Sequence, residues 1–293
     1  MPHIPVLLKE TIKILDPRLG EFFIDGTLGK GGHAKEVLKQ VGSEGIFLGV
    51  DWDRKAVENC KLKIGDYQNV IFVQDNFANL PEILAKNNLP QANGLILDLG
   101  FSSEQIENLN RGFSFRSSAQ GDEPLLMTYS DGQKPAHEWL KRLKESELAA
   151  IIKKFGEERY AFKIAKAIKK NLPITTTGKL ADLIKDAVPR NYERGRIHPA
   201  TRTFMALRIF VNNELENLEV VLRALDSILA RGGRAAIISF NSLEDRIVKR
   251  HFTSLVKEKK AILLNKKPIQ PAREELIKNP RARSAKLRAI RII

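Results

Sequence analysis

Short apolar runs alternate with amphipathic stretches through the first hundred residues. The apolar runs are rich in Ile, Val, Leu and Phe, and they cover residues 21–25, 45–51, 70–73 and 94–99. Between them, residues 33–40 and 54–64 place apolar side chains at helical spacing. Strands that alternate with helices are typical of a parallel sheet covered on both faces. We therefore predict an α/β fold whose ligands bind beyond the carboxyl ends of the strands.

This alternation stops near residue 102 and resumes near residue 234. The chain between these points opens with a polar, aromatic stretch and then shows helical spacing. A long helical pattern from about Pro199 to Ala230 precedes Gly232-Gly233, which we expect to end the helix. Residues 235–240 then repeat the buried-strand pattern. We predict a discontinuous α/β domain over residues 1–105 and 207–293, interrupted by a helical domain over residues 106–206.

Basic residues outnumber acidic ones, and the excess is concentrated near the C-terminus. The chain has 49 Lys and Arg against 35 Asp and Glu, a formal net charge of +14. Residues 249–293 hold 14 of these cations and three acids, and apolar runs at 261–264 and 287–293 predict strands there. Such a surface favours a polyanionic partner such as nucleic acid. Abundant Lys and Glu are also typical of thermophilic proteins, an alternative that composition leaves open.

Several classes of protein are excluded or disfavoured by composition. The single cysteine, Cys60, excludes an intrachain disulfide. The five histidines lack the spacing of metal ligands, so we expect no metal. No uncharged apolar stretch is long enough to span a bilayer, and the N-terminus does not resemble a signal peptide. We predict a soluble, cytoplasmic protein without a membrane partner.

A glycine-rich segment, DGTLGKGGH at residues 25–33, follows the first predicted strand. Its four glycines let the backbone approach a ligand closely at the start of a helix. The segment lacks both the Lys-Ser/Thr pair of a P-loop and the G-x-G-x-x-G of dinucleotide-binding folds. Asp51 ends the second predicted strand, where a carboxylate can accept hydrogen bonds from both ribose hydroxyls.

Ligand-type residues also end the third and fourth predicted strands. Phe77 offers an aromatic face for a purine, and Asp98 lies beside Gly100. Each acid could instead cap a helix. Four such strand ends together favour a nucleoside with a non-phosphate appendage, and therefore S-adenosylmethionine rather than NAD.

Longer motifs occur in order along nearly the whole chain, namely HIPVLL (3–8), DGTLGKGGH (25–33), DLGFSSEQ (98–105), RGFSF (111–115), GEER (156–159), HPATRTFMALRIFVNNEL (198–215), ISFNSLEDRIVK (238–249) and NPRARSAKLR (279–288). With them the sequence resembles the bacterial 16S ribosomal RNA cytosine-N(4) methyltransferase family, also called MraW or RsmH. The resemblance implies a Rossmann-like class I S-adenosylmethionine-dependent methyltransferase fold with an inserted helical domain. It also implies S-adenosylmethionine as the methyl donor and a cytidine in the ribosomal decoding region as the acceptor.

The resemblance further implies a set of cofactor contacts, made by Gly31, Gly32, His33, Asp51 (ribose), Phe77 (adenine), Asp98 and Gln105. Asp98 is our first candidate for the group that accepts the amine proton, and Asn241 is a second. Ser242 is expected to cap the helix that follows. Two positions depart from the family pattern: Asn241 stands where His is usual, and Leu126 where Asp is common. Both departures concern the acceptor side.

The implied partner is 16S rRNA in the small ribosomal subunit. An acceptor base must leave its stack to be reached. We expect RNA contacts from cationic and aromatic residues of the polar loop, the insertion and the C-terminal loop, namely Arg111, Phe113, Phe115, Arg194, Arg196, Arg202, Arg281 and Arg283. A homodimer is compatible with the sequence.

Two other functions are left open by the sequence. One is a methyltransferase that acts on a small molecule or a protein. The other is an RNA-binding assembly factor that keeps the cofactor fold without turnover. Methylation at cytosine C5 is disfavoured, because it needs a thiolate nucleophile, and Cys60 lies within a predicted helix, where we expect it to be a packed core residue.

Overall fold

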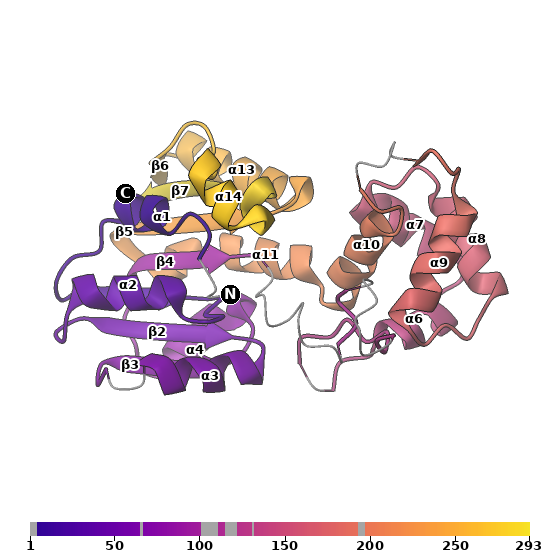
Figure 1. Ribbon diagram of the computed structural model, residues 1–293. Helices are drawn as coiled ribbons and strands as arrows, with labels where there is room; N and C mark the ends of the chain where they lie inside the picture. Colours follow the sequence, from indigo (N-terminus) through magenta and orange to yellow (C-terminus); the bar gives the residue numbers. More distant parts are fainter. Residues whose placement is uncertain (1–4, 65–66, 101–110, 115–121, 131, 193–196) are drawn as a thin grey trace. The chain divides into compact units, whose positions relative to one another are not determined.

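The computed structural model describes residues 5–64, 67–100, 111–114, 122–130, 132–192 and 197–293. The chain divides into two compact units (Figure 1). Unit 1 comprises Met1–Gly100 and Leu215–Ile293, and unit 2 comprises Phe101–Glu214.

In the described part of unit 1, seven strands form one sheet in the order β3-β2-β1-β4-β5-β7-β6. Neighbouring strands from β3 to β5 are parallel, whereas β7 is antiparallel to both β5 and β6. The strands are β1 (Phe22–Asp25), β2 (Ile46–Asp51), β3 (Val70–Gln74), β4 (Ala92–Asp98), β5 (Leu229–Ser239), β6 (Ala261–Leu263) and β7 (Lys286–Ile292). This arrangement confirms the predicted Rossmann-like α/β fold. The strand order reverses between β1 and β4, and ligands of open α/β sheets bind beyond such a reversal.

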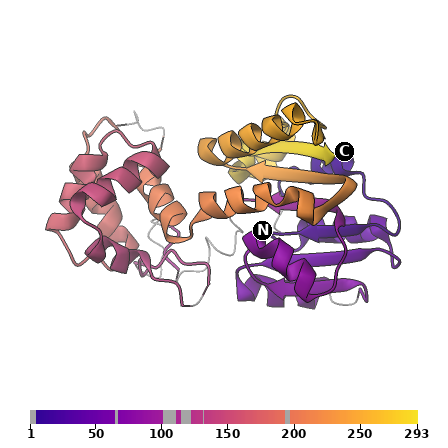
Figure 2. The same ribbon diagram turned by 180° about the vertical axis from the view of Figure 1, so that it is seen from behind.

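Helices cover both faces of this sheet, as a parallel sheet requires. α1 (Leu8–Leu15), α2 (Gly32–Val41) and α3 (Arg54–Ile64) pack on one face, around Phe23, Phe47 and Ile96. The other face is covered by α4 (Leu80–Lys86), α11 (Glu214–Arg223), α12 (Leu225–Ile228) and α13 (Ser242–Lys257). Figure 1 shows α2 in front of the sheet, and Figure 2 shows the orange helix α11 on the opposite side.

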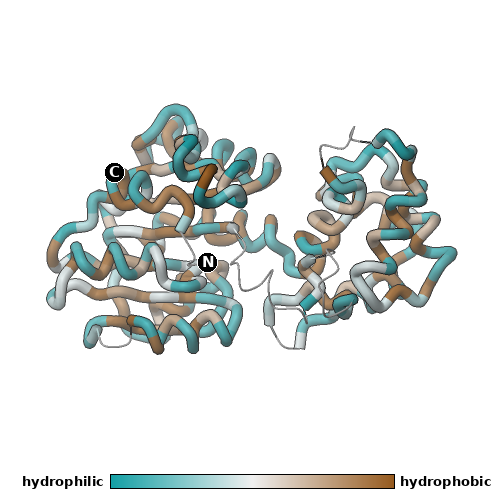
Figure 3. Tube along the Cα trace, in the orientation of Figure 1, coloured by the Kyte–Doolittle hydropathy of each residue, from teal (hydrophilic) through white to brown (hydrophobic). Residues whose placement is uncertain are grey.

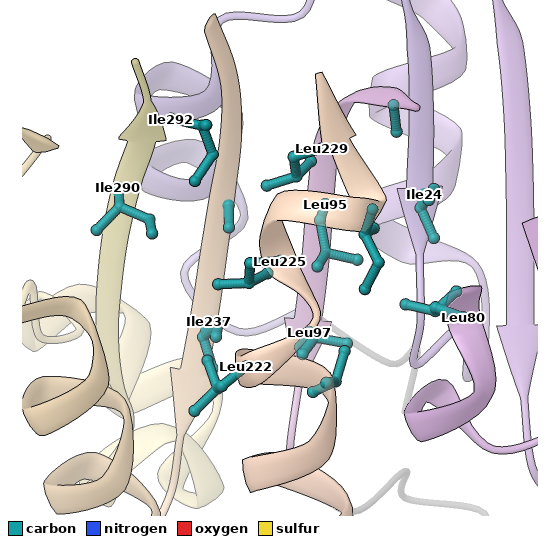
Figure 4. Close-up of a cluster of buried hydrophobic side chains, with 14 of the residues drawn as sticks. Ile24, Leu80, Leu95, Leu97, Leu222, Leu225, Leu229, Ile237, Ile290 and Ile292 are labelled. Carbon is teal, nitrogen blue, oxygen red and sulfur yellow. The ribbon is translucent and has the colours of Figure 1, made fainter. Parts of the chain in front are cut away.

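The core on the α11 side is built from the same apolar runs that predict the strands. Leu95 and Leu97 of β4 and Ile237 of β5 meet Leu222 and Leu225 of the covering helices (Figure 4). Along the chain trace, the apolar colour is concentrated in the strands, while the covering helices alternate between apolar and polar (Figure 3). The C-terminal part of the unit adds α14 (Arg273–Lys278) and the 3-10 turn η3 (Pro280–Ser284).

Unit 2 is helical in its described residues. Its helices are α6 (Ala136–Arg142), α7 (Glu145–Gly156), α8 (Ala161–Lys170), α9 (Thr177–Ala187) and α10 (Thr201–Val211). They enclose a core of their own that includes Leu148, Ile164, Leu180 and Phe204. α7 packs against both α8 and α10. The predicted boundary at residue 206 falls inside α10.

The long helical pattern expected from Pro199 to Ala230 is wrong as a single helix. It forms α10, α11 and α12, and Asn213, between the first two, has φ 50°. The side-chain amide of Asn212, which is buried, donates a 2.8 Å hydrogen bond to the Met127 carbonyl. This hydrogen bond holds the chain at the break between the helices. Gly232-Gly233 does not end a helix but lies inside β5, at an irregularity in its pairing with β4.

The described residues contain no helix that is both long enough and apolar enough to cross a membrane.

Gly94 of β4 allows a close contact at the centre of the sheet. A Cβ at this position would lie 2.0 Å from the Cε1 atom of Phe23, which is fully buried. We predict that Gly94→Ala lowers the free energy of unfolding by about 1–3 kcal/mol, because an overpacked core must displace the ring. Chemical denaturation measures this change. Adding Phe23→Leu should recover part of the loss, and equal stability of the single variant and wild type would contradict the prediction.

Candidate active site

The glycine-rich loop connects β1 to α2 through backbone that favours glycine. Gly29 and Gly31 have φ values of 49° and 73°, in the left-handed region. Gly31 also packs against Cys60, since a Cβ there would lie 2.5 Å from the Cys60 Sγ atom. Cys60 is therefore a buried core residue of α3, as the sequence predicts.

The Asp51 side chain, at the end of β2, binds the backbone of this loop. One carboxylate oxygen of Asp51 accepts a 2.8 Å hydrogen bond from the Gly29 backbone amide, and the other accepts one of 2.8 Å from the Asp53 backbone amide. Asp53 in turn accepts a hydrogen bond from the Lys55 amide in the first turn of α3. Asp51 therefore joins the glycine loop to the end of the second strand.

Asp98, at the end of β4, is linked to the same loop. Its backbone amide donates a 2.7 Å hydrogen bond to Thr27 Oγ1, and its carboxylate accepts one of 3.2 Å from the Gly100 amide. Burial raises the pKa of Asp98 from 3.8 to about 6, and the Gly100 hydrogen bond opposes part of this rise. At neutral pH the carboxylate is mostly ionised and is a stronger base than an ordinary aspartate.

Asp25, at the end of β1, lies between these two acids along the sheet and is 1% exposed. Burial, and to a smaller extent the negative charges of Asp98 and Asp51, raise its pKa to about 7. The Thr27 amide donates a 3.0 Å hydrogen bond to it, which lowers the pKa in part. The sequence analysis assigned no role to Asp25. Its position at the end of an apolar run is the feature that places it beside Asp51 and Asp98.

His33, in the first turn of α2, is neutral. Burial lowers its pKa to about 4, and its Nε2 donates a 3.1 Å hydrogen bond to the Val6 carbonyl. Its Nδ1 lies 4.0 Å from the Asp98 carboxylate. Because the ring is uncharged at neutral pH, this approach is not an ion pair, and Nδ1 carries no proton while Nε2 donates. The predicted cofactor residues His33 and Asp98 are thus brought together.

Phe77 begins the 3-10 turn η1 (Phe77–Asn79), which follows β3 and is capped by Asn76. The ring is partly buried and packs against the core of the α11 side. A Cβ on Gly26 would lie 3.1 Å from the Phe77 Cβ, so Phe77 stands beside the glycine loop. Gly31, Gly32, His33, Asp51, Phe77 and Asp98 therefore belong to one edge of the sheet, whereas Gln105 lies outside the described residues.

Asn241 is the N-cap of α13, a role that we expected of Ser242. Its side-chain oxygen accepts hydrogen bonds of 3.0 Å from the amides of Leu243 and Glu244. Its Nδ2 donates to Glu244, whose carboxylate also accepts a 2.8 Å hydrogen bond from the Phe240 amide. This reciprocal capping box commits the amide to the helix start, and an amide does not titrate. Asn241, which stands where the family usually has His, therefore caps α13.

The predicted RNA contacts are spread over both units. In unit 2, Arg111 donates to the Tyr129 carbonyl, Phe113 stacks on the Tyr129 ring with centroids 5.2 Å apart, and Arg202 donates to the Gly156 carbonyl. In unit 1, Arg281 and Arg283 are exposed on η3. Phe115, Arg194 and Arg196 lie outside the described residues. Leu126 is partly exposed in unit 2.

A family model matches the entire chain. The description of that model is the MraW methylase family, and the match covers residues 1–293. The chain belongs to this family. It is a methyltransferase, and the resemblance predicted from its motifs is confirmed.

Curated relatives agree with this assignment over nearly their full length. A ribosomal RNA small subunit methyltransferase H from Halothermothrix orenii is 40% identical, over 98% of this chain and 97% of the relative. Relatives with the same name from Syntrophotalea carbinolica and Coprothermobacter proteolyticus are 42% and 43% identical, over 99% of this chain in each case and 97% and 95% of the relatives.

The Asp25 carboxylate should destabilise the protein at high pH. Because its pKa is raised from 3.8 to about 7 on folding, its proton is bound more tightly by the folded state, and stability is lost as the pH rises from about 4 to about 7. We predict that Asp25→Asn, which keeps the oxygen facing Thr27, raises the free energy of unfolding at pH 8 by up to about 4 kcal/mol. At pH 4 the change should be small.

Thermal denaturation without added ligand, at both pH values, measures this difference. The matched control is Asp16→Asn, because Asp16 is exposed and pairs with Arg18 at the surface. The control should show no comparable gain. An equal effect of Asp25→Asn at both pH values would contradict the raised pKa.

Proposed function

We propose that the protein transfers a methyl group from S-adenosylmethionine to the exocyclic N(4) of a cytidine in the decoding region of 16S rRNA. Membership of the MraW methylase family and the names of the relatives support the reaction and the RNA. The observation that carries the proposal is the meeting of Asp25, Asp51 and Asp98 around the glycine loop, with the pKa of Asp98 raised to about 6.

The negative charge at this edge fits the proposed cofactor. Asp25 is held close to Asp51 and Asp98, and His33 is neutral, so it does not offset these charges. A cationic sulfonium relieves the repulsion between the carboxylates, whereas a pyrophosphate would increase it. Thus the electrostatics favour S-adenosylmethionine over a dinucleotide.

Individual residues are assigned to parts of the cofactor. Gly31, Gly32 and His33 lie where a backbone can approach it, Asp51 faces the ribose, and Phe77 offers its ring to the adenine; Gln105 completes the proposed set. When bound, S-adenosylmethionine supplies an electrophilic methyl group on a positively charged sulfur.

Asp98 is the proposed proton acceptor. The lone pair of the cytosine amine is conjugated with the ring and is weakly nucleophilic, so a base must take a proton from the amine as the new N–C bond forms. The bond from the methyl carbon to sulfur would break at the same time, and its electron pair would leave the sulfur as a neutral thioether. A carboxylate with a pKa of about 6 is mostly ionised at neutral pH and accepts this proton more readily than an ordinary aspartate. The Thr27 hydroxyl and the Gly100 amide fix the position of Asp98 through its backbone and its side chain.

A basic surface on unit 1 supports a polyanionic substrate. The exposed face of α13 carries Arg246, Lys249, Arg250 and Lys257, which border a hollow of about 530 Å³. The nearby acid Asp245 is turned to β7, where it pairs with Lys286 and Arg288. The four cations of α13, with Thr253 and Ser254 between Arg250 and Lys257, therefore form a basic surface that suits a phosphate backbone.

The test uses small ribosomal subunits from a strain that lacks this methylation. After incubation with the protein and labelled S-adenosylmethionine, digestion of the RNA should yield labelled N(4)-methylcytidine. Tight cofactor binding without transfer would favour the assembly-factor alternative. Label in a free small molecule or a protein instead would favour the other one.

We predict that Asp98→Asn lowers the single-turnover rate by at least about a hundredfold, because no carboxylate then accepts the amine proton. The wild-type rate should fall about tenfold for each pH unit below 6, as Asp98 becomes protonated. Asp226→Asn, at an exposed acid of α12, is the control and should keep the wild-type rate. A wild-type rate that is flat between pH 5 and 7 would exclude Asp98 as the acceptor.

A further inference from the structure

Two cations of unit 2 lie on a pair of tyrosine rings. Arg159 and Tyr160 occupy the turn between α7 and α8, Lys163 lies in the first turn of α8, and Tyr192 follows α9. The tyrosine rings meet edge to face, with centroids 5.1 Å apart. The Arg159 guanidinium carbon is 5.4 Å from the Tyr192 centroid and 6.0 Å from that of Tyr160, and Lys163 Nζ is 5.6 Å from the Tyr160 centroid. We call these four residues the cation–tyrosine cluster.

A buried carboxylate fixes the tyrosines of this cluster. Glu158 is 1% exposed, and its two oxygens accept 2.7 Å hydrogen bonds from the Tyr192 hydroxyl and from the Tyr160 amide. One oxygen thus fixes the Tyr192 ring, and the other fixes the backbone at Tyr160, next to Arg159. The buried acid therefore holds the two segments that carry the rings in place beneath the exposed arginine.

The cations of the cluster are available to an external anion. Arg159 and Lys163 are exposed, and within the described part of the chain neither forms an ion pair with a carboxylate. By contrast, the exposed Arg54 of unit 1 is bound to Glu58 at 2.7 Å. A guanidinium that lies on aromatic rings is held in one orientation and keeps its N–H edge for a phosphate.

An exposed aromatic ring lies next to the cluster in the sequence. Phe162, in the first turn of α8, is 63% exposed, while Ala161 and Ile164 of the same turn are buried in the core. Cations beside an exposed aromatic ring are the combination with which proteins bind single-stranded nucleic acid, since the ring stacks on a base and the cations meet the backbone.

We propose that the cation–tyrosine cluster is a phosphate-binding site for a single-stranded segment of the RNA substrate, with Phe162 contacting a neighbouring base. The proposal rests on the proposed function, because it takes ribosomal RNA as the partner. The sequence analysis assigned no role to the GEER motif or to the helix after it. The proposed site therefore adds to the RNA contacts expected from the sequence.

The experiment measures binding of the protein to small ribosomal subunits that lack the methylation, over a series of salt concentrations. Arg159→Ala is expected to weaken binding on the order of tenfold and to reduce the slope of log K against log salt by about 0.7, the value for one phosphate of a single strand. Lys163→Ala should act in the same direction. Phe162→Leu should weaken binding without changing the slope, because it removes stacking and no charge.

The matched control is Arg142→Ala, at an exposed arginine of α6 in the same unit that lies on no aromatic ring in the described residues. It should change affinity and slope much less than Arg159→Ala. Arg159→Lys keeps the charge and is expected to keep the slope while losing part of the affinity, which provides a second measurement if the alanine variant folds poorly. Circular dichroism and cofactor affinity confirm that each variant is folded.

An unchanged salt slope in Arg159→Ala, or an equal effect in Arg142→Ala, would overturn the site. Methyl transfer by the wild-type protein is measured in the same preparations. If the wild type methylates the subunits and Arg159→Ala binds them normally, the phosphate-binding site is wrong and the proposed function is retained. If the wild type binds with an Arg159-dependent slope but transfers no methyl group, the proposed function fails and the inference stands.

Discussion

The gathering of three acids at one edge of a parallel sheet, one of them fully buried, is the constraint on which the candidate site depends. Asp25, Asp51 and Asp98 end neighbouring strands, and their closeness to one another contributes to the raised pKa of Asp25. Backbone amides of the glycine loop offset part of this negative charge. The Gly29 amide donates a hydrogen bond to Asp51, and the Thr27 amide donates one to Asp25. Because the pKa of Asp25 is raised on folding, the fold maintains this edge at a cost to stability above that pKa.

Much of unit 1 could be predicted from the sequence, because strands buried on both faces are nearly continuous apolar runs. The bounds of α3 and the core position of Cys60 followed from helical spacing in the same way. The placement of β7 between β5 and β6 could not be predicted, because it depends on pairing between distant segments. The breaks after α10 were also missed, since Asn213 adopts its left-handed backbone where Asn212 binds a carbonyl from residue 127.

The sequence predicted that the candidate residues end neighbouring strands, whereas it could not predict their ionisation. Motif resemblance indicated Asp98 and His33, but only the fold shows that burial raises the pKa of the acid and lowers that of the imidazole. Asn241 is the reverse case. Its departure from the family pattern drew attention to the acceptor side, whereas its amide caps α13 in a reciprocal arrangement with Glu244. Capping residues of adjacent positions, such as Asn241 and Ser242, cannot be distinguished without the backbone.

The N-terminal segment is held by residues from the other end of the chain. The Leu7 amide donates a 2.9 Å hydrogen bond to Glu275, and the neighbouring Val6 carbonyl accepts the hydrogen bond that orients His33. β5 likewise pairs with β7, whose residues come long after those of β1 to β4 in the chain. Unit 2, in contrast, is one contiguous stretch of sequence. During synthesis, therefore, all residues of the inserted unit are made before those of β7, and this unit can fold while the sheet is still incomplete.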